Sequence, residues 1–290
     1  GREKRRRAML RIGPSGNSLS FYESGHKHTF ESAKWLAAMG LNAYEYSFGR
    51  GVKMSDETAA KIRSEMDKYG IEVSVHAPYY TNFSNPDPEM IDKSISYVYQ
   101  SLAAVKKLGG KRVVFHPASQ GKAEREEAVA LARDNIAKMM TVLGETLPFS
   151  DYILCPETMG KIRQIGTVEE IVSFCKLDPH LYPCYDFGHI NCYMHGGLKT
   201  EDDYRRIIDY TFAELGEEKA KNIHIHFSKI QYGESGEIRH LTFADTIYGP
   251  EYAPLAKIID EYRMTPFIVC ESDGTMAEDA LNMKKHHKNV

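Results

Sequence analysis

Short apolar segments alternate with amphipathic helical segments along nearly the whole chain of 290 residues. This regular alternation is typical of βα units and predicts a parallel sheet. The expected strands are Leu10–Gly13, Ala43–Phe48, Ile71–Val75, Arg112–Phe115, Tyr152–Cys155, Leu181–Tyr185, Asn222–Phe227 and Phe267–Cys270. With eight such units, the economical α/β fold is a single-domain (β/α)8 TIM barrel. A doubly wound open sheet is the alternative, but no GxGxxG or Walker-type loop follows the first strand.

The helices between these strands carry recognisable boundary residues. Ser55 is expected to cap a helix whose first residues, Asp56 and Glu57, suit the positive end of the helix dipole. The expected helices are Phe30–Met39, Ser55–Tyr69, Pro88–Leu108, Glu124–Leu143, Val168–Cys175, Glu201–Leu215, Glu251–Tyr262 and Met276–His286. We expect a long polar loop over 228–249. Residues 1–8 are expected to be a tail, which leaves residues 9–290 as the barrel domain.

Composition restricts the classes of protein to which this chain can belong. The formal net charge is −3, so bulk charge alone does not predict nucleic-acid binding. No apolar run approaches the roughly 18 residues of a membrane span, and no partnership with a membrane is expected. Five cysteines without a CxxC pair argue against a disulfide framework and against a thiolate zinc site. They favour a reducing compartment and hence a cytoplasmic location.

Imidazole and carboxylate side chains follow one expected strand after another. In a barrel, the carboxyl ends of the strands surround one mouth, so these side chains would converge there. The residues at these ends are His76, His116, Glu157, Asp186 with His189, His224 and His226, and Glu271, with His240 in the loop after the seventh strand. Several carboxylates at one mouth would repel each other, and a bound cation is the natural compensation. The donor types suit zinc or another first-row divalent metal.

The seventh strand offers two candidate ligands. His224 and His226 are two residues apart and therefore share a face of the strand. Nearness to the mouth alone would favour His226.

Seven short motifs together resemble the endonuclease IV family of abasic-site endonucleases, within the xylose isomerase-like TIM barrels. The motifs are HAPYYTN, FHP, PET, DFGH, HIHFSK, RH and CES, and they extend from the third strand to the eighth. The resemblance implies a trinuclear zinc cluster and cleavage of double-stranded DNA 5′ to an abasic site. The seventh-strand pattern of the family, similar to His-x-Asn-Asp-Ser-Lys, aligned on Ser228 and Lys229, favours His224 as the ligand.

The resemblance also assigns ligands by position. His76 and His116 would bind a first metal. Glu157 would bridge to a second metal, which Asp186, His224 and Glu271 complete. His189 and His240 would hold a third. Substrate contacts carried over in the same way are Arg50, Tyr79, Asn82 and Lys229.

Two departures mark the chain as a divergent member. The family places an Asp two residues before the position of His240, where this chain has Ile238. Either the third metal is lost or Glu237 replaces that Asp. On the seventh strand, His226 and Phe227 stand where the family favours Asn and Asp.

These observations predict a zinc-dependent endonuclease of DNA repair with two or three ions, manganese being the alternative metal. Glu157 and Glu271 are the expected catalytic residues: Glu157 to bridge two ions around an activated hydroxide, and Glu271 to orient or deprotonate it. The alternative is a sugar isomerase or epimerase, because Glu157, Asp186, His224 and Glu271 also resemble the single-metal site of such barrels. The surplus histidines favour the nuclease. We expect a monomer.

Overall fold

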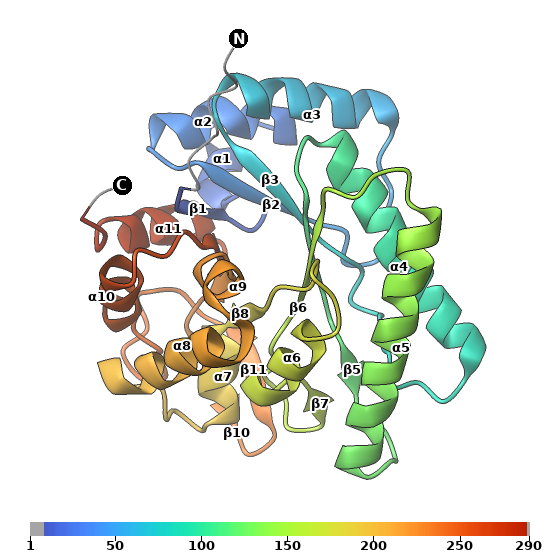
Figure 1. Ribbon diagram of the computed structural model, residues 1–290. Helices are drawn as coiled ribbons and strands as arrows, with labels where there is room; N and C mark the ends of the chain where they lie inside the picture. Colours follow the sequence, from blue (N-terminus) through green and yellow to red (C-terminus); the bar gives the residue numbers. More distant parts are fainter. Residues whose placement is uncertain (1–8, 289–290) are drawn as a thin grey trace.

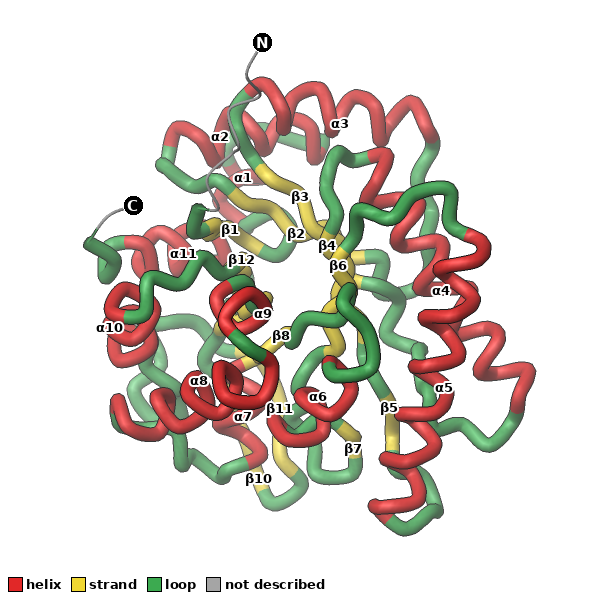
Figure 2. Tube along the Cα trace, in the orientation of Figure 1, coloured by secondary structure: helices red, strands yellow, loops and turns green. Residues whose placement is uncertain are grey.

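Eight parallel strands form a closed barrel in the structure of this protein, a computed structural model that describes residues 9–288 (Figure 1). The barrel strands are β1 (Arg11–Pro14), β2 (Ala43–Ser47), β3 (Glu72–His76), β4 (Arg112–Phe115), β6 (Ile153–Pro156), β8 (Cys184–Asp186), β9 (His224–Phe227) and β12 (Phe267–Cys270). Figure 2 shows these strands around the centre and the helices outside them. The predicted barrel is therefore confirmed. The predicted tail, residues 1–8, lies outside the described residues.

The barrel consists of two four-stranded ladders that meet at two seams. One ladder has the order β1-β12-β9-β8 and the other β2-β3-β4-β6. Single bridges join them, Ser15 to Glu45 at one seam and Glu157 to Cys184 at the other. Gly13 allows the first seam to close, because a Cβ atom there would lie 1.6 Å from the carbonyl oxygen of Ala43.

The helices surround the barrel and begin at residues that satisfy their first backbone N–H groups. Ser55 Oγ accepts a hydrogen bond from Thr58 N at 3.1 Å, which confirms the predicted cap. Thr167 and Glu170 form a capping box at the start of a later helix. The helices are α1 (Leu19–Glu23), the 3-10 helix η1 (Thr29–Glu31), α2 (Ser32–Ala38), α3 (Asp56–Lys68), α4 (Pro88–Lys107), α5 (Arg125–Thr146), α6 (Val168–Cys175), α7 (Phe187–Tyr193), α8 (Glu201–Leu215), α9 (Glu217–Lys221), α10 (Ala253–Glu261) and α11 (Met276–Lys284).

Several elements at the mouth of the barrel were not predicted. Within the expected loop 228–249, β10 (Ile230–Gly233) and β11 (Gly236–His240) form an antiparallel hairpin. The short strands β5 (Ala118–Ser119) and β7 (Gln164–Ile165) pair across two other loops. Helix α7 starts directly after β8, with Asp186 as its N-cap. The mouth is therefore built from ordered elements that fix the side chains they carry.

The apolar faces of strands and helices pack into one large core, which accounts for the apolar periodicity of the sequence. All five cysteines are free and buried. Among residues 9–288, we find no helix with the length and apolarity that a membrane span requires.

Candidate metal centre

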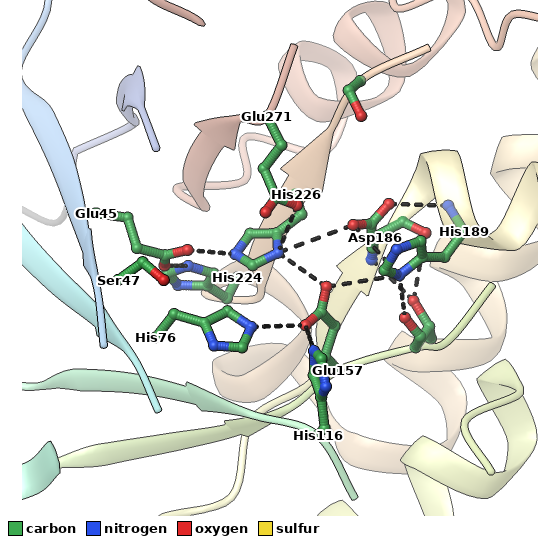
Figure 3. Close-up of polar contacts among 12 residues, drawn as sticks. Glu45, Ser47, His76, His116, Glu157, Asp186, His189, His224, His226 and Glu271 are labelled. Atoms are coloured by element: carbon green, nitrogen blue, oxygen red, sulfur yellow. Dashed lines mark hydrogen bonds and ion pairs between the residues drawn. The ribbon is translucent and has the colours of Figure 1, made fainter. Parts of the chain in front are cut away.

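Glu157 lies at the centre of a cluster of histidines and carboxylates at the mouth of the barrel (Figure 3). It follows β6 directly, and its side chain is almost fully buried. Its Oε1 atom lies 3.0 Å from His76 Nε2 and 3.1 Å from His116 Nε2. These two histidines come from the end of β3 and from the residue after β4, as the sequence predicts. The structure thus brings the first expected ligand set together.

The second oxygen of Glu157 faces a group formed by β8, β9 and the end of β12. His226 Nδ1 lies 3.0 Å from Glu157 Oε2 and 3.0 Å from Glu271 Oε1. Asp186 Oδ2 lies 3.9 Å from the same nitrogen. One donor atom from each of Glu157, Asp186, His226 and Glu271 lies within 4.8 Å of the others, a spacing that could hold one metal ion.

His224 does not reach this group, contrary to the assignment made from the family pattern. It is two residues deeper in the barrel, where its Nε2 atom lies 2.7 Å from Glu45 Oε1. The register explains the difference, because Asp186 pairs with His226 across β8 and β9, whereas His224 pairs with Cys184. The position nearest the mouth therefore belongs to His226, as the strand geometry alone indicated.

A third group contains His189, Glu237 and His240, whose donor atoms also lie within 4.8 Å of one another. Glu237 Oε2 lies 3.1 Å from His189 Nε2 and 3.5 Å from His240 Nε2. Glu237 thus occupies the place left by Ile238, a residue that is 57% exposed. The structure supports replacement of the missing Asp by Glu237 over loss of the position.

Three of the clustered histidines have Nδ1 beside a neutral oxygen, and in His189 this nitrogen also lies 3.3 Å from Asp186 Oδ2. His76 Nδ1 donates to Ala77 O at 2.6 Å, and His189 Nδ1 donates to Thr158 O at 2.8 Å. His240 Nδ1 lies 2.8 Å from Ser228 Oγ. Each contact turns Nε2 toward a carboxylate, which is how proteins orient metal-binding imidazoles.

Mutual contacts shift the pKa values of the cluster strongly. Burial alone would raise the pKa of Glu157, but the surrounding histidines, His226 foremost, hold it well below its usual range. Burial raises the pKa of Asp186 well above its usual value. For His189, burial opposes protonation, but Asp186 and Glu237 raise its pKa well above the usual value. Without a cation, these carboxylates are thus compensated by protons and protonated histidines.

The donor set fits divalent cations in a second respect. Asp186 Oδ2 and Glu271 Oε1 are buried and have no hydrogen-bond partner among residues 9–288. Imidazole nitrogens lie 3.3 Å from Asp186 Oδ2 and 3.0 Å from Glu271 Oε1, but buried carboxylate oxygens normally also accept hydrogen bonds, so both oxygens could accept a further ligand. Imidazole nitrogens and carboxylate oxygens suit zinc and related metals. Cys184 also lies within reach of Glu157 and His226, and burial raises the pKa of its thiol well above the usual range.

The expected substrate contacts are distributed unevenly. Tyr79 lies at the mouth, where its ring stacks on His116 with centroids 5.5 Å apart and its hydroxyl lies 3.1 Å from Ser47 Oγ. Arg50 is exposed on the loop after β2. Asn82 Oδ1 accepts from the backbone N–H groups of Ser84 and Ser119 at 3.0 and 3.1 Å, which orders that loop.

Lys229 does not reach the cluster, contrary to the expectation. Its side chain is buried, and Nζ donates to Phe243 O at 3.2 Å and to Asp245 O at 2.6 Å. It also pairs with Glu251 Oε1 at 2.9 Å. Lys229 therefore holds the segment after the β10–β11 hairpin in place.

One residue close to the cluster was missed in the sequence. Glu45 stands in the middle of β2 and is fully buried, with its Oε2 atom 2.7 Å from His226 Nε2. A charged residue inside the apolar segment AYEYSF was the signal that could have revealed it.

Comparisons with known proteins agree with this architecture. The sequence profile described as xylose isomerase-like TIM barrel matches residues 33–286. An uncharacterized protein of Methanocaldococcus jannaschii, MJ0133, is 30% identical over 98% of this chain and 99% of its own length. A protein named probable endonuclease 4 of Staphylococcus carnosus is 28% identical over 58% of this chain and 56% of its own length. The resemblance to endonuclease IV is thereby confirmed at the level of sequence.

Solved structures share the fold with different activities. Endonuclease IV from Thermus thermophilus superposes with a TM-score of 0.63 at 19% identity, covering 89% of this chain and 91% of that one. The 3-keto-D-glucoside 4-epimerase of E. coli superposes with a TM-score of 0.65 at 15% identity, covering 96% and 97%. The shared barrel does not distinguish these activities. The distinction between a nuclease and an epimerase has to come from the side chains at the mouth.

Proposed function

Since this chain belongs to the xylose isomerase-like TIM barrel family, as a divergent relative of endonuclease IV, we propose that it is a metal-dependent endonuclease that cleaves DNA 5′ to abasic sites. The observation that carries the proposal is the size of the donor set. Of the five donor groups among residues 9–288, three would each hold one cation: His76–His116–Glu157, Glu157–Asp186–His226–Glu271, and His189–Glu237–His240. A sugar isomerase with one metal needs only the middle group.

Each group would hold one divalent cation. Glu157 belongs to two groups and would bridge their ions through its two oxygens, because Oε1 faces His76 and His116 while Oε2 faces His226. His226 takes the place in the middle group that the family pattern predicts for His224. We infer zinc from the donor types, with manganese as the alternative.

The chemistry divides between the ions and the side chains of the chain. Bound divalent cations supply Lewis acidity and lower the pKa of bound water. Glu157 would position the ions relative to one another. Glu271 is the most exposed carboxylate of the middle group, with 22% of its side chain accessible, against 1% for Asp186. It is therefore placed to accept a proton from water that enters from the mouth.

The substrate contacts of this proposal lie on the loops around the cluster. Tyr79 is 52% exposed beside His116 and offers a flat face for a sugar or a base. Arg50, on the neighbouring loop, would contact a phosphate or enter the duplex. Because the formal net charge of the chain is −3, bound cations would supply much of the positive charge that a phosphodiester requires.

A metal count paired with a cleavage assay tests the proposal. We expect two to three zinc ions per chain by elemental analysis and nicking of an abasic-site duplex that EDTA abolishes. The control substrate is the same duplex with an intact base. One metal per chain and an intact abasic duplex would overturn the proposal and favour epimerisation of a sugar, for which the middle group alone suffices. Full nicking activity of Glu271→Ala with its metals retained would refute the role of Glu271.

A further inference from the structure

Glu45 places a carboxylate beside His224 and His226 (Figure 3), and it pairs with Ser74, two residues deeper along β3 than His76. Its Oε1 atom accepts a hydrogen bond from Ser74 Oγ at 2.9 Å and lies 2.7 Å from His224 Nε2. Its Oε2 atom lies 2.7 Å from His226 Nε2. Glu45, Ser74, His224 and His226 are all fully buried. A carboxylate in this position contacts no substrate directly, and its effect must pass through the histidines.

The contact with His226 differs from the arrangement of two other histidines of the cluster. In His76 and His240, a neutral oxygen lies beside Nδ1, and Nε2 faces a carboxylate. In His226 the arrangement is reversed, because Nδ1 faces Glu157 and Glu271 while Nε2 faces Glu45. The 2.7 Å contact between Glu45 Oε2 and His226 Nε2 is an ion pair, and neither atom has a hydrogen-bond partner among residues 9–288. His226 is thus the member of this set whose remote nitrogen meets a charged group.

The carboxylate of Glu45 is itself held firmly. His224, its second imidazole partner, stacks on the ring of Phe267 with centroids 5.0 Å apart and an interplanar angle of 10°. Ser74 stands on the adjacent strand β3, paired with Glu45 in the barrel ladder. With one oxygen fixed by Ser74 and His224, the other is held against His226. The extra histidine of the seventh strand therefore serves to anchor Glu45.

We propose that Glu45 is a positioning residue that keeps His226 in its Nε2–H form and turns Nδ1 toward Glu157, Asp186 and Glu271. Metal binding by this middle group then depends on a residue that touches neither metal nor substrate. The inference rests on the proposed metal centre but on no particular reaction. A carboxylate behind a ligand histidine typically contributes about 10- to 100-fold to metal affinity.

The test compares Glu45→Gln with Glu72→Gln, which removes a carboxylate near the other end of the barrel, where Glu72 pairs with Arg11. Zinc affinity is measured by competition with a chelator, and the coordination geometry by the visible absorption of the cobalt-substituted protein. We expect Glu45→Gln to weaken one zinc site about 10- to 100-fold and to change the cobalt spectrum. Glu72→Gln should leave both unchanged. Wild-type affinity and spectrum in Glu45→Gln would overturn the proposal, as would a wild-type protein that binds no metal at the middle group.

A second measurement needs no variant and guards against a misfolded Glu45→Gln protein. Nitrogen-15 NMR of histidine-labelled, zinc-loaded wild type distinguishes a protonated Nε2 from a protonated Nδ1. We expect His226 to carry its proton on Nε2, and a proton on Nδ1 would overturn the proposal. Zinc binding that depends on Glu45 in a protein without nicking activity would refute the endonuclease and leave the positioning role intact. Nicking activity together with a zinc affinity that does not depend on Glu45 would refute the positioning role and leave the endonuclease proposal intact.

Discussion

Glu237 and His240 belong to the same donor group although they stand three positions apart along β11. In a regular strand, side chains two residues apart share a face. Here Gln231 pairs with Arg239 and Tyr232 pairs with Glu237, which leaves Ile238 without a partner in the ladder. Such a bulge shifts the alternation of faces by one residue. The bulge at Ile238 thus compensates for the three-position spacing of Glu237 and His240, which replaces the two-position spacing of the family.

Deleting Ile238 should therefore leave the third metal position intact. The deletion converts Glu-Ile-Arg-His to Glu-Arg-His, in which Glu237 and the histidine share a face of a regular strand. We expect an unchanged zinc count by elemental analysis, whereas Glu237→Gln should lose one ion per chain. Ile238→Ala serves as the control for loss of the side chain alone. If the deletion also loses one ion, the bulge has a role beyond spacing.

The two histidines of β9 should differ sharply when replaced. His226→Asn removes a donor from the middle group, and we expect the loss of one zinc ion and a fall in nicking rate of about 100-fold or more. His224→Asn removes only the partner of Glu45, and we expect all ions to remain, one of them bound more weakly. Dialysis against graded chelator concentrations separates the two results. Equal metal loss in both variants would contradict the assignment of distinct roles.

Zinc binding near neutral pH should release protons. Burial opposes protonation of His189 and His226, but nearby groups raise the pKa of both well above the usual value: Asp186 and Glu237 for His189, and Cys184, Glu271 and Glu45 for His226. We therefore expect the metal-free protein to carry these protons near neutral pH. A metal binds only the neutral imidazole, so the protons must leave. The number released should fall as the pH rises through these raised pKa values, and zinc affinity should rise. Calorimetry in buffers of different ionisation enthalpy gives the count, and a value of zero at pH 7 would contradict the shifts.

The loss of folding stability at acidic pH should depend in part on Glu170. Arg125 Nη2 lies 2.6 Å from Glu170 Oε1, and the backbone N–H of Thr167 donates to the same oxygen at 3.0 Å. Burial alone would raise the pKa of Glu170, but these partners lower it in the folded protein. The contribution of ionised Glu170 to the free energy of unfolding is therefore complete above the pKa of the unfolded state, about 4.3. It is lost as the pH falls through the lowered pKa of the folded state.

Glu170→Gln should lower the free energy of unfolding by about 1–2 kcal/mol at pH 7 and by less at pH 3. Urea unfolding at both pH values measures the difference. Glu169→Gln, one residue earlier in α6, is the matched control and should change stability little. An equal loss for Glu170→Gln at both pH values would show that its charge is not responsible.

The barrel could be predicted from the sequence because its signals are local. Apolar segments such as Arg112–Phe115 and Phe267–Cys270, and the helices Val168–Cys175 and Glu201–Leu215, have the boundaries that the patterns indicate. The β10–β11 hairpin escaped prediction because its sequence, IQYGESGEIRH, is polar and its pairing is interrupted by the bulge. Helix α7 escaped because it has only seven residues and begins directly after β8, with Asp186 as both the last strand residue and the N-cap.

The membership of the site was largely predictable, but its register was not. His76, His116, Glu157, Asp186, His189, His240 and Glu271 each follow a visible strand or motif, and the structure brings them together. The choice between His224 and His226 depends on which residue pairs with Asp186, and this is a property of three-dimensional register. Lys229 matched a family position in sequence, yet its side chain is committed to backbone carbonyls of a neighbouring loop.

The two ladders of the barrel each carry part of the donor set. His76, His116 and Glu157 belong to the half that contains β2, β3, β4 and β6, whereas Asp186, His226 and Glu271 belong to the half with β8, β9 and β12. A cation held between Glu157 and the second set would tie one half-barrel to the other, close to the seam where backbone pairing is reduced to isolated bridges. The metal centre would then cross-link the two half-barrels. Loss of its ions would destabilise the barrel at the seam where isolated bridges join the two ladders.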